Sequence, residues 1–219
     1  MSLIAPSILN SDFLVLGETL NMLNDSEADW VHLDVMDGSF VPNISFGIPI
    51  VEAAKRISKK PLDVHLMIVN PEKYIEDFRN AGADVITIHF EACRKKDLKS
   101  ILHTIRESGA KPSISIKPDT PIEALYDIAE YIDMALIMSV FPGFGGQKFI
   151  EETYTRIMDL KQFINDNKLS ALIEVDGGVS LDNVAKLKSV GVDVMVVGSV
   201  IFNAKSPTQT ISELKSLVR

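Results

Sequence analysis

The stretch Val31-His32-Leu33-Asp34-Val35-Met36-Asp37-Gly38 alternates apolar and polar side chains as a β-strand does. Successive side chains of a strand point to opposite faces, so His32 and Asp34 share one face and the apolar residues between them share the other. An imidazole and a carboxylate are costly to bury unless they are paired, hydrogen-bonded or bound to a metal. The stretch therefore predicts a buried strand that carries chemically active groups on one face.

Two further stretches predict strands of the same kind. Residues 62–67 (LDVHLM) place Asp63 and His65 on one face, and residues 171–178 (ALIEVDGG) end in an acid followed by two glycines. Imidazole and carboxylate donors together suit Zn²⁺, Fe²⁺, Mn²⁺ or Co²⁺. We therefore expect one divalent metal ion per chain at these strand ends. The expected ligands are His32, Asp34, His65 and Asp176.

Composition limits the class of protein. A chain of 219 residues can form one domain, and we expect residues 1–219 to do so. The net charge of −8 argues against a nucleic-acid partner. A single cysteine, Cys93, excludes an intramolecular disulfide and fits a reducing compartment, so we expect a cytoplasmic protein. No basic segment precedes the first apolar run, and no apolar run is long enough for a membrane span.

A repeat of one strand and one helix runs through the chain. Helical patterns end and apolar strands begin near residues 28, 83, 110 and 192, close to multiples of about 27 residues, which is one eighth of the chain. Strands alternating with helices predict a parallel sheet, and eight such units favour a single (β/α)₈ TIM barrel in the α/β class. An open doubly wound sheet is the alternative, but the first turn lacks its glycine fingerprint. The expected strands are residues 3–9, 30–36, 61–67, 84–89, 111–117, 134–140, 171–176 and 193–198.

Glycine clusters follow the last three expected strands. In a TIM barrel the active site lies at the carboxyl ends of the strands, and the late loops commonly bind phosphate through backbone N–H groups. Tight turns are the other explanation of each cluster, but three clusters in consecutive loops favour a phosphorylated ligand. The residues expected to bind it are Gly143, Phe144, Gly145, Gly146, Gly177, Gly178, Gly198 and Ser199.

Several other side chains have expected roles near the strand ends. Met36, Met67 and Met138 are expected either to line the pocket and exclude water or to pack in the core. We expect His89 to fix a loop by hydrogen bonding, and His103 to be exposed on a helix. Asp37 is expected to order the loop after its strand, and Asp63 to orient a metal ligand.

Five stretches together resemble the ribulose-phosphate 3-epimerase family. They are APSIL (5–9), HLDVMDGSFVPN (32–43), HLM (65–67), PGFGGQ (142–147) and EVDGGV (174–179). The resemblance implies a barrel of the ribulose-phosphate-binding type that interconverts D-ribulose 5-phosphate and D-xylulose 5-phosphate in the pentose phosphate pathway. It also implies a homo-oligomer, either a dimer or a hexamer. The chain departs from the family pattern at Phe141, where relatives usually have a polar residue.

The resemblance also assigns roles to individual residues. It implies that Asp34 and Asp176 are the acid/base pair as well as metal ligands, and that Ser7, His65 and Asp176 contact the substrate. Inversion of carbon 3 needs proton transfer on both faces, which two carboxyl groups can perform through an enediolate. A divalent metal ion would stabilise the enediolate charge.

Three alternatives to this function differ in what they require. D-allulose-6-phosphate 3-epimerase would use the same groups on a sugar with one more carbon. A decarboxylase of the same superfamily would carry Asp-x-Lys-x-x-Asp on a strand, but residue 36 is Met rather than Lys. A non-catalytic sugar-phosphate-binding barrel would bind its ligand without exchanging the carbon-3 proton.

Overall fold

The computed structural model describes residues 2–219, in which eight strands form one sheet. Every pair of hydrogen-bonded neighbouring strands is parallel, and the strand order is β1-β8-β7-β6-β5-β4-β3-β2. This arrangement confirms the predicted barrel. The strands are β1 (Leu3–Pro6), β2 (Val31–Met36), β3 (Leu62–Met67), β4 (Val85–His89), β5 (Lys111–Ile116), β6 (Met134–Met138), β7 (Leu172–Asp176) and β8 (Val194–Val197).

The first and last strands of this order, β1 and β2, are joined more loosely than the others. An isolated parallel bridge links Ser7 to His32. Below it, the backbone N–H groups of Asp29 and Trp30 donate to the carbonyl of Ile4 at 2.9 and 3.4 Å. These contacts close the sheet on itself, so the open doubly wound sheet is excluded.

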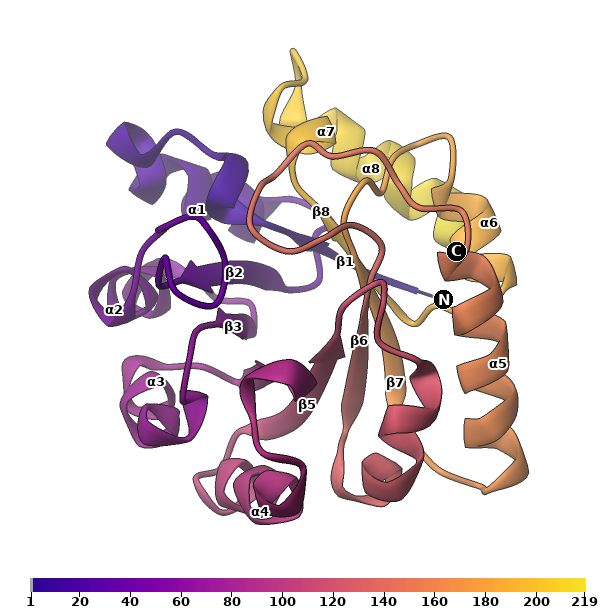
Figure 1. The fold of residues 1–219 in the computed structure, drawn as a ribbon. Coiled ribbons are helices and arrows are strands. Elements are labelled where there is room, and N and C mark those ends of the chain that lie inside the picture. The colour runs from indigo at the N-terminus through magenta and orange to yellow at the C-terminus, as the bar shows by residue number, and fades with distance from the viewer. Residues whose placement is uncertain (1) are drawn as a thin grey trace.

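Helices follow the strands and surround the barrel (Figure 1). The connection after β5 contains a 3₁₀-helix, η6 (Ile122–Tyr131), in place of an α-helix. Both ends of the described chain lie on the same side of the barrel, where Ser2 N–H donates to the carbonyl of Val218 at 3.2 Å. The α-helices are α1 (Leu16–Asp25), α2 (Ile48–Ile57), α3 (Ile75–Ala81), α4 (Leu98–Glu107), α5 (Thr153–Asp166), α6 (Val184–Ser189), α7 (Ser199–Phe202) and α8 (Pro207–Val218).

The main core lies between the strands and the surrounding helices. Leu33 and Val35 of β2 belong to one buried cluster with Leu20 and Leu23 of α1 and Val51 of α2. Because side chains alternate along β2, this packing turns His32 and Asp34 into the barrel. The apolar face of the strand therefore orients the chemically active face.

Two strands, β1 and β6, end two or three residues earlier than predicted. The chain leaves β1 at Pro6 and forms a 3₁₀ turn, η1 (Ile8–Asn10), in which Ser11 N–H donates to the carbonyl of Ile8 at 3.0 Å. Likewise β6 ends at Met138 instead of residue 140. Both apolar runs continue beyond the strand because the loops at this end of the barrel are themselves buried. Within residues 2–219, no helix is both long and apolar enough to span a membrane.

Candidate active site and metal centre

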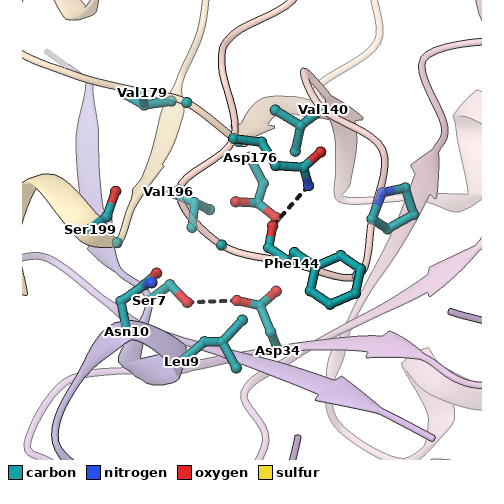
Figure 2. Close-up of a pocket in the computed structure, with 18 of the residues that line it drawn as sticks. Ser7, Leu9, Asn10, Asp34, Val140, Phe144, Asp176, Val179, Val196 and Ser199 are labelled. Atoms are coloured by element: carbon teal, nitrogen blue, oxygen red, sulfur yellow. Dashed lines mark hydrogen bonds between the residues drawn. The ribbon is translucent and has the colours of Figure 1, made fainter. Parts of the chain in front are cut away.

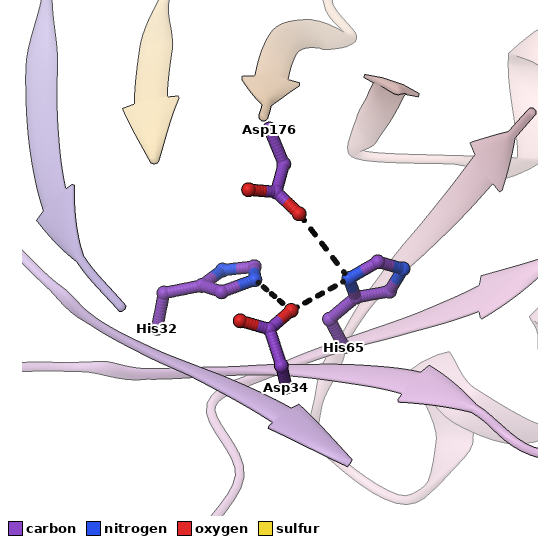
Figure 3. A group of neighbouring side chains, drawn as sticks. All are labelled: His32, Asp34, His65 and Asp176. Atoms are coloured by element: carbon purple, nitrogen blue, oxygen red, sulfur yellow. Dashed lines mark hydrogen bonds and ion pairs between the residues drawn. The ribbon is translucent and has the colours of Figure 1, made fainter. Parts of the chain in front are cut away.

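The register of β2 against β3 brings the predicted ligands together. His32 lies opposite Asp63, and Asp34 lies opposite His65. Both histidines are fully buried and Asp34 is almost so. Asp176, the last residue of β7, points at this group from across the barrel (Figure 3). Four residues from three strands therefore meet, although they are up to 144 positions apart in the sequence.

The distances within this group fit a bound metal ion. Nε2 of His32 and Nδ1 of His65 each lie 3.1 Å from Oδ1 of Asp34. Oδ2 of Asp176 lies 3.9 Å from Nδ1 of His65, and the four donor atoms all lie within 4.8 Å of one another. A tetrahedral ion with ligands at about 2.0–2.2 Å separates those ligands by roughly 3.3–3.6 Å. The predicted set therefore has room for one such ion.

The hydrogen-bond partners behind the two imidazoles support the same conclusion. Nδ1 of His32 lies 2.5 Å from Oδ2 of Asp63, so it donates outward and leaves Nε2 facing Asp34. Nε2 of His65 has an outward partner too, His89 at 2.9 Å. The lone pairs of His32 Nε2 and His65 Nδ1 then face Oδ1 of Asp34 and repel it, unless a cation or a proton lies between these atoms. Burial lowers the pKa of His32, but the charges of Asp34 and Asp63 outweigh it and raise that pKa well above its usual value.

The two aspartates of the site have opposite protonation tendencies. Burial opposes ionisation of Asp34, yet the charges and hydrogen bonds of His32 and His65 outweigh it and hold its pKa well below the usual range. Ser7 also donates to Oδ2 of Asp34 at 2.5 Å. Burial and the nearby charge of Asp34 raise the pKa of Asp176 to about 6. One carboxyl group is therefore held ionised while the other accepts a proton readily.

A pocket opens directly above this group at the carboxyl ends of the strands. The carboxyl groups of Asp34 and Asp176 face each other across it (Figure 2). Its volume is about 240 Å³. Of the residues with predicted substrate or lining roles, those that line it are Ser7, Met36, Met67, Met138, Gly143, Phe144, Gly145, Gly146, Asp176, Gly177, Gly178, Gly198 and Ser199. His65 lies below the pocket floor, fully buried, so a direct substrate contact by this residue stays a prediction.

The glycines of this pocket permit close approach of neighbouring groups. A Cβ atom on Gly178, whose φ is +63°, would lie 2.6 Å from the backbone nitrogen of Phe149. A Cβ on Gly145 or Gly198 would lie 2.6 or 2.2 Å from the side-chain amide of Asn10. These loops can therefore pack tightly and leave backbone N–H groups free to meet an anion. Phe141 is half exposed and outside the lining, although its carbonyl accepts from Gln147 Nε2 at 2.7 Å.

The remaining expectations concern side chains around the site. Asp37 orders its loop as predicted, accepting from the N–H groups of Ser39, Phe40 and Val69 at 2.8–2.9 Å. Asp63 contacts one of the predicted ligands: its Oδ2 lies 2.5 Å from Nδ1 of His32 on the neighbouring strand.

Both remaining histidines lie where they are predicted to lie. His103 is exposed on α4. His89 is a buried hydrogen-bonding residue: Nδ1 lies 3.1 Å from Oε2 of Glu91, which in turn accepts from the backbone N–H of Lys117. Burial lowers the pKa of His89 to about 4, so its ring is neutral.

Asn10 and Glu174 are two of the site residues that had no predicted role. Asn10 lines the pocket from η1, a segment predicted to lie near a strand end, and the only hint was its place after the APSIL stretch. Glu174 is fully buried with both carboxyl oxygens lacking a hydrogen-bond partner among the described residues, and Oε1 lies 3.9 Å from Nδ1 of His32. Burial and the charge of Asp63 raise the pKa of Glu174 well above its usual value. An acid inside an apolar strand was the available signal.

Comparisons with known proteins agree with this geometry. Residues 3–202 match the model of the ribulose-phosphate 3 epimerase family. A ribulose-phosphate 3-epimerase of Synechocystis sp. is 45% identical over 216 residues, which cover 99% of this chain and 94% of the relative. The chloroplastic ribulose-5-phosphate-3-epimerase of Arabidopsis thaliana is 41% identical over 217 residues, covering 99% and 77%. The crystal structure of KGPDC from Streptococcus mutans shares the fold, with a TM-score of 0.75, 15% identity and coverage of 100% and 97%.

Proposed function

The chain belongs to the ribulose-phosphate 3-epimerase family, and we propose that it interconverts D-ribulose 5-phosphate and D-xylulose 5-phosphate in the pocket between β2 and β7. Membership of this family makes the chain an isomerase. The observation that supports the proposed site best is the pair of acids, Asp34 and Asp176, which face one pocket with opposite protonation tendencies.

Inversion of carbon 3 requires two proton transfers on opposite faces of the sugar. Asp34 is the ionised base that removes the carbon-3 proton from one face, because its pKa is held low and Ser7 fixes one of its oxygens. Asp176, whose pKa is raised to about 6, returns a proton to the other face. In the reverse reaction the two acids exchange roles. An enediolate lies between the two transfers and carries negative charge on the oxygens of carbons 2 and 3.

His32, Asp34, His65 and Asp176 would hold one divalent cation beside these oxygens. When bound, such a cation supplies positive charge that stabilises the enediolate, a contribution of several kcal/mol. The mixed donor set suits Zn²⁺, Fe²⁺, Mn²⁺ or Co²⁺. Asp63 keeps the ring of His32 in the orientation that this role requires.

The phosphate group of the substrate is expected to bind at the glycine loops after β6, β7 and β8. Gly145, Gly178 and Gly198 bring backbone into contact with the pocket, where N–H groups can donate to phosphate oxygens. Binding energy at this remote end positions carbon 3 between the two acids. Met36 and Met138 also line the pocket, where their apolar side chains would exclude water from the reacting carbon.

The proposal is tested by comparing three substrates with the purified protein. We expect conversion of D-ribulose 5-phosphate to D-xylulose 5-phosphate, followed by NMR, with kcat/KM at least tenfold above that for D-allulose 6-phosphate. Non-phosphorylated D-ribulose should react far more slowly because it lacks the remote binding energy. A preference for the hexulose phosphate would assign the chain to the allulose reaction instead. Tight binding without conversion would support a binding protein.

We extend the proposal to the assembly and setting of the protein. Residues 1–219 are proposed to form one domain, since one sheet and one large buried cluster run through the described chain. We propose a homo-oligomer, a dimer or a hexamer, because the resemblance to the family implies one. The proposed setting is the pentose phosphate pathway of the cytoplasm. Light scattering and cell fractionation test these points.

A further inference from the structure

A buried chain of hydrogen-bonding groups lies behind the proposed metal ligand His65. His89, the last residue of β4, has no exposed surface, and both of its ring nitrogens have partners. Nε2 of His89 lies 2.9 Å from Nε2 of His65, and Nδ1 lies 3.1 Å from Oε2 of Glu91. These hydrogen bonds therefore connect the proposed metal centre through His89 to Glu91. Neither His89 nor Glu91 belongs to the group of four proposed ligands.

Glu91 is held by donors on its other oxygen. Oε1 accepts from the backbone N–H of Lys117 at 2.8 Å and from the hydroxyl of Thr120. Arg156 of α5 fixes the loop that carries these donors, because Nη2 donates to the carbonyls of Lys117 and Thr120 at 2.9 and 2.7 Å. Burial opposes ionisation, but these hydrogen bonds and that of His89 outweigh it and lower the pKa of Glu91 to about 2. Glu91 is therefore a carboxylate, which can only accept.

The Glu91 carboxylate determines which ring nitrogens of His89 and His65 carry a hydrogen. Because Glu91 can only accept, Nδ1 of His89 must carry a hydrogen. Only one of the two facing nitrogens, Nε2 of His89 and Nε2 of His65, can carry a hydrogen across 2.9 Å, and His89 already has its hydrogen on Nδ1, so its Nε2 is the acceptor. Nε2 of His65 must then donate to it. This leaves the lone pair of His65 Nδ1 directed at Asp34 and Asp176, as a metal ligand requires.

We infer that His89 and Glu91 are positioning residues that fix the hydrogen of His65 on Nε2 and so keep its Nδ1 available as a metal ligand. The inference rests on the proposed function, because it concerns the metal centre of that same site. It assigns to the loops after β4 and β5 a part in metal affinity, although they contribute none of the four ligands.

The substitution Glu91→Gln reverses the direction of the hydrogen bonds from residue 91 to His65, while the side chain keeps nearly the same shape. The backbone N–H of Lys117 can only donate and requires an acceptor at the position of Oε1, so the amide oxygen of the glutamine is held there. Its NH₂ group then faces His89 and forces Nδ1 of that ring to accept. His89 must now donate from Nε2, against the N–H of His65, which disfavours the ligand form of His65.

Two measurements test the inference, and neither depends on turnover. In the Zn²⁺-loaded wild type, ¹⁵N NMR should show His89 protonated at Nδ1 and unprotonated at Nε2. Competition with a chromophoric chelator should show that Glu91→Gln weakens Zn²⁺ binding by roughly tenfold to a hundredfold, as expected when the group that orients a ligand is lost. The conservative variant Glu91→Asp, which keeps an acceptor, should retain more affinity than Glu91→Gln.

Glu107→Gln is the matched control, because Glu107 lies 4.0 Å from His103 in a surface histidine–glutamate pair, both side chains being about two thirds exposed. It should leave Zn²⁺ affinity unchanged. A hydrogen on Nε2 of His89 in the wild type would overturn the inference, and so would Glu91→Gln binding Zn²⁺ as tightly as the wild type. The NMR measurement needs no variant, so it decides the question even if Glu91→Gln does not fold. Failure of the wild type to epimerise ribulose 5-phosphate, with these results intact, would count against the proposed function alone.

Discussion

Ser7 donates its hydroxyl hydrogen to Oδ2 of Asp34 at 2.5 Å, while Oδ1 of the same carboxylate faces the imidazoles of His32 and His65. Ser7 is also the residue that bridges β1 to β2 where the barrel closes. The residue whose backbone bridges the closing strands therefore also fixes one oxygen of the proposed base through its side chain. Fold and proposed chemistry depend on the same residue.

Replacement of Ser7 by alanine should slow epimerisation with little effect on folding. A hydrogen bond to a charged group contributes about 1.5–3 kcal/mol, which corresponds to a roughly tenfold to hundredfold fall in kcat/KM. Steady-state kinetics measure this fall. Ser11→Ala is the control, because the Ser11 hydroxyl donates to the carbonyl of Ile8 and the residue does not line the pocket. Wild-type kinetics for Ser7→Ala would show that this hydrogen bond has no catalytic role.

Loss of a metal-binding imidazole should remove both metal and activity. The variant His32→Ala takes away one of the four proposed donors, so we expect less than one divalent ion per chain by elemental analysis, with an unchanged circular dichroism spectrum. Chelation of the wild type should abolish turnover, and added Zn²⁺, Fe²⁺, Mn²⁺ or Co²⁺ should restore it. His103→Ala serves as control, since His103 is exposed on α4. Full activity of metal-stripped protein would contradict the role of the cation.

A methyl group on Gly178 should disrupt the proposed phosphate loop. Its Cβ would lie 2.6 Å from the backbone nitrogen of Phe149, and the φ of +63° disfavours a side chain. We expect Gly178→Ala to raise KM for ribulose 5-phosphate at least tenfold and to weaken inhibition by inorganic phosphate. Gly47→Ala, where a Cβ meets nothing within 4 Å, should behave as the wild type. An unchanged KM in Gly178→Ala would place the phosphate elsewhere.

The raised pKa of Asp176 makes a prediction about stability. A carboxyl group whose pKa rises from 3.8 to about 6 on folding favours the folded state below pH 3.8, and this stabilisation is lost as the pH rises through about 6. In chelated protein, Asp176→Asn should therefore gain stability relative to the wild type between pH 4 and pH 7, by on the order of 1–3 kcal/mol. Urea unfolding at several pH values measures the difference. Asp127→Asn, on an exposed residue paired with Lys95, should show no such trend. A constant difference for Asp176→Asn would contradict the raised pKa.

The repeat of strands and helices was enough to predict the barrel, and alternation along single strands was enough to select four candidate ligands whose donor atoms meet in the structure. His32 and Asp34 are two residues apart on one strand, so their shared face follows from strand geometry alone. The partners of those ligands could not be predicted in this way. Asp63 was expected to orient a ligand that alternation could not identify, and the register of β2 and β3 places it beside His32. Strand register depends on the packing of the whole sheet and is not a property of one strand.

The parts of the site that lie on loops were the hardest to predict. Asn10 belongs to a 3₁₀ turn that continues an apolar run, and nothing local distinguishes that turn from the end of a strand. His89 was expected to hold a loop, yet its second contact, with His65, depends on how β3 and β4 pair. Glu91 and Thr120 are 29 residues apart and meet only because their strands are neighbours. Contacts of this kind need the three-dimensional structure.

The two acids should fail in different ways when each is replaced. In Asp34→Asn or Asp176→Asn one half of the proton relay is lost, so epimerisation should fall by a factor on the order of a hundred to ten thousand. The remaining acid can still exchange the carbon-3 proton of the epimer whose hydrogen faces it. One variant should therefore exchange solvent deuterium into ribulose 5-phosphate and the other into xylulose 5-phosphate, provided that elemental analysis finds metal in both. Near wild-type epimerisation by either metal-loaded variant would rule out the two-base mechanism.

The most direct measurement is the reaction of the wild-type protein with D-ribulose 5-phosphate in D₂O, followed by NMR. If Asp34 and Asp176 transfer protons on opposite faces of carbon 3, xylulose 5-phosphate should form with deuterium at carbon 3 and nowhere else. Formation of xylulose 5-phosphate that keeps its original carbon-3 hydrogen throughout, or incorporation of deuterium at another carbon, would contradict the proposed mechanism.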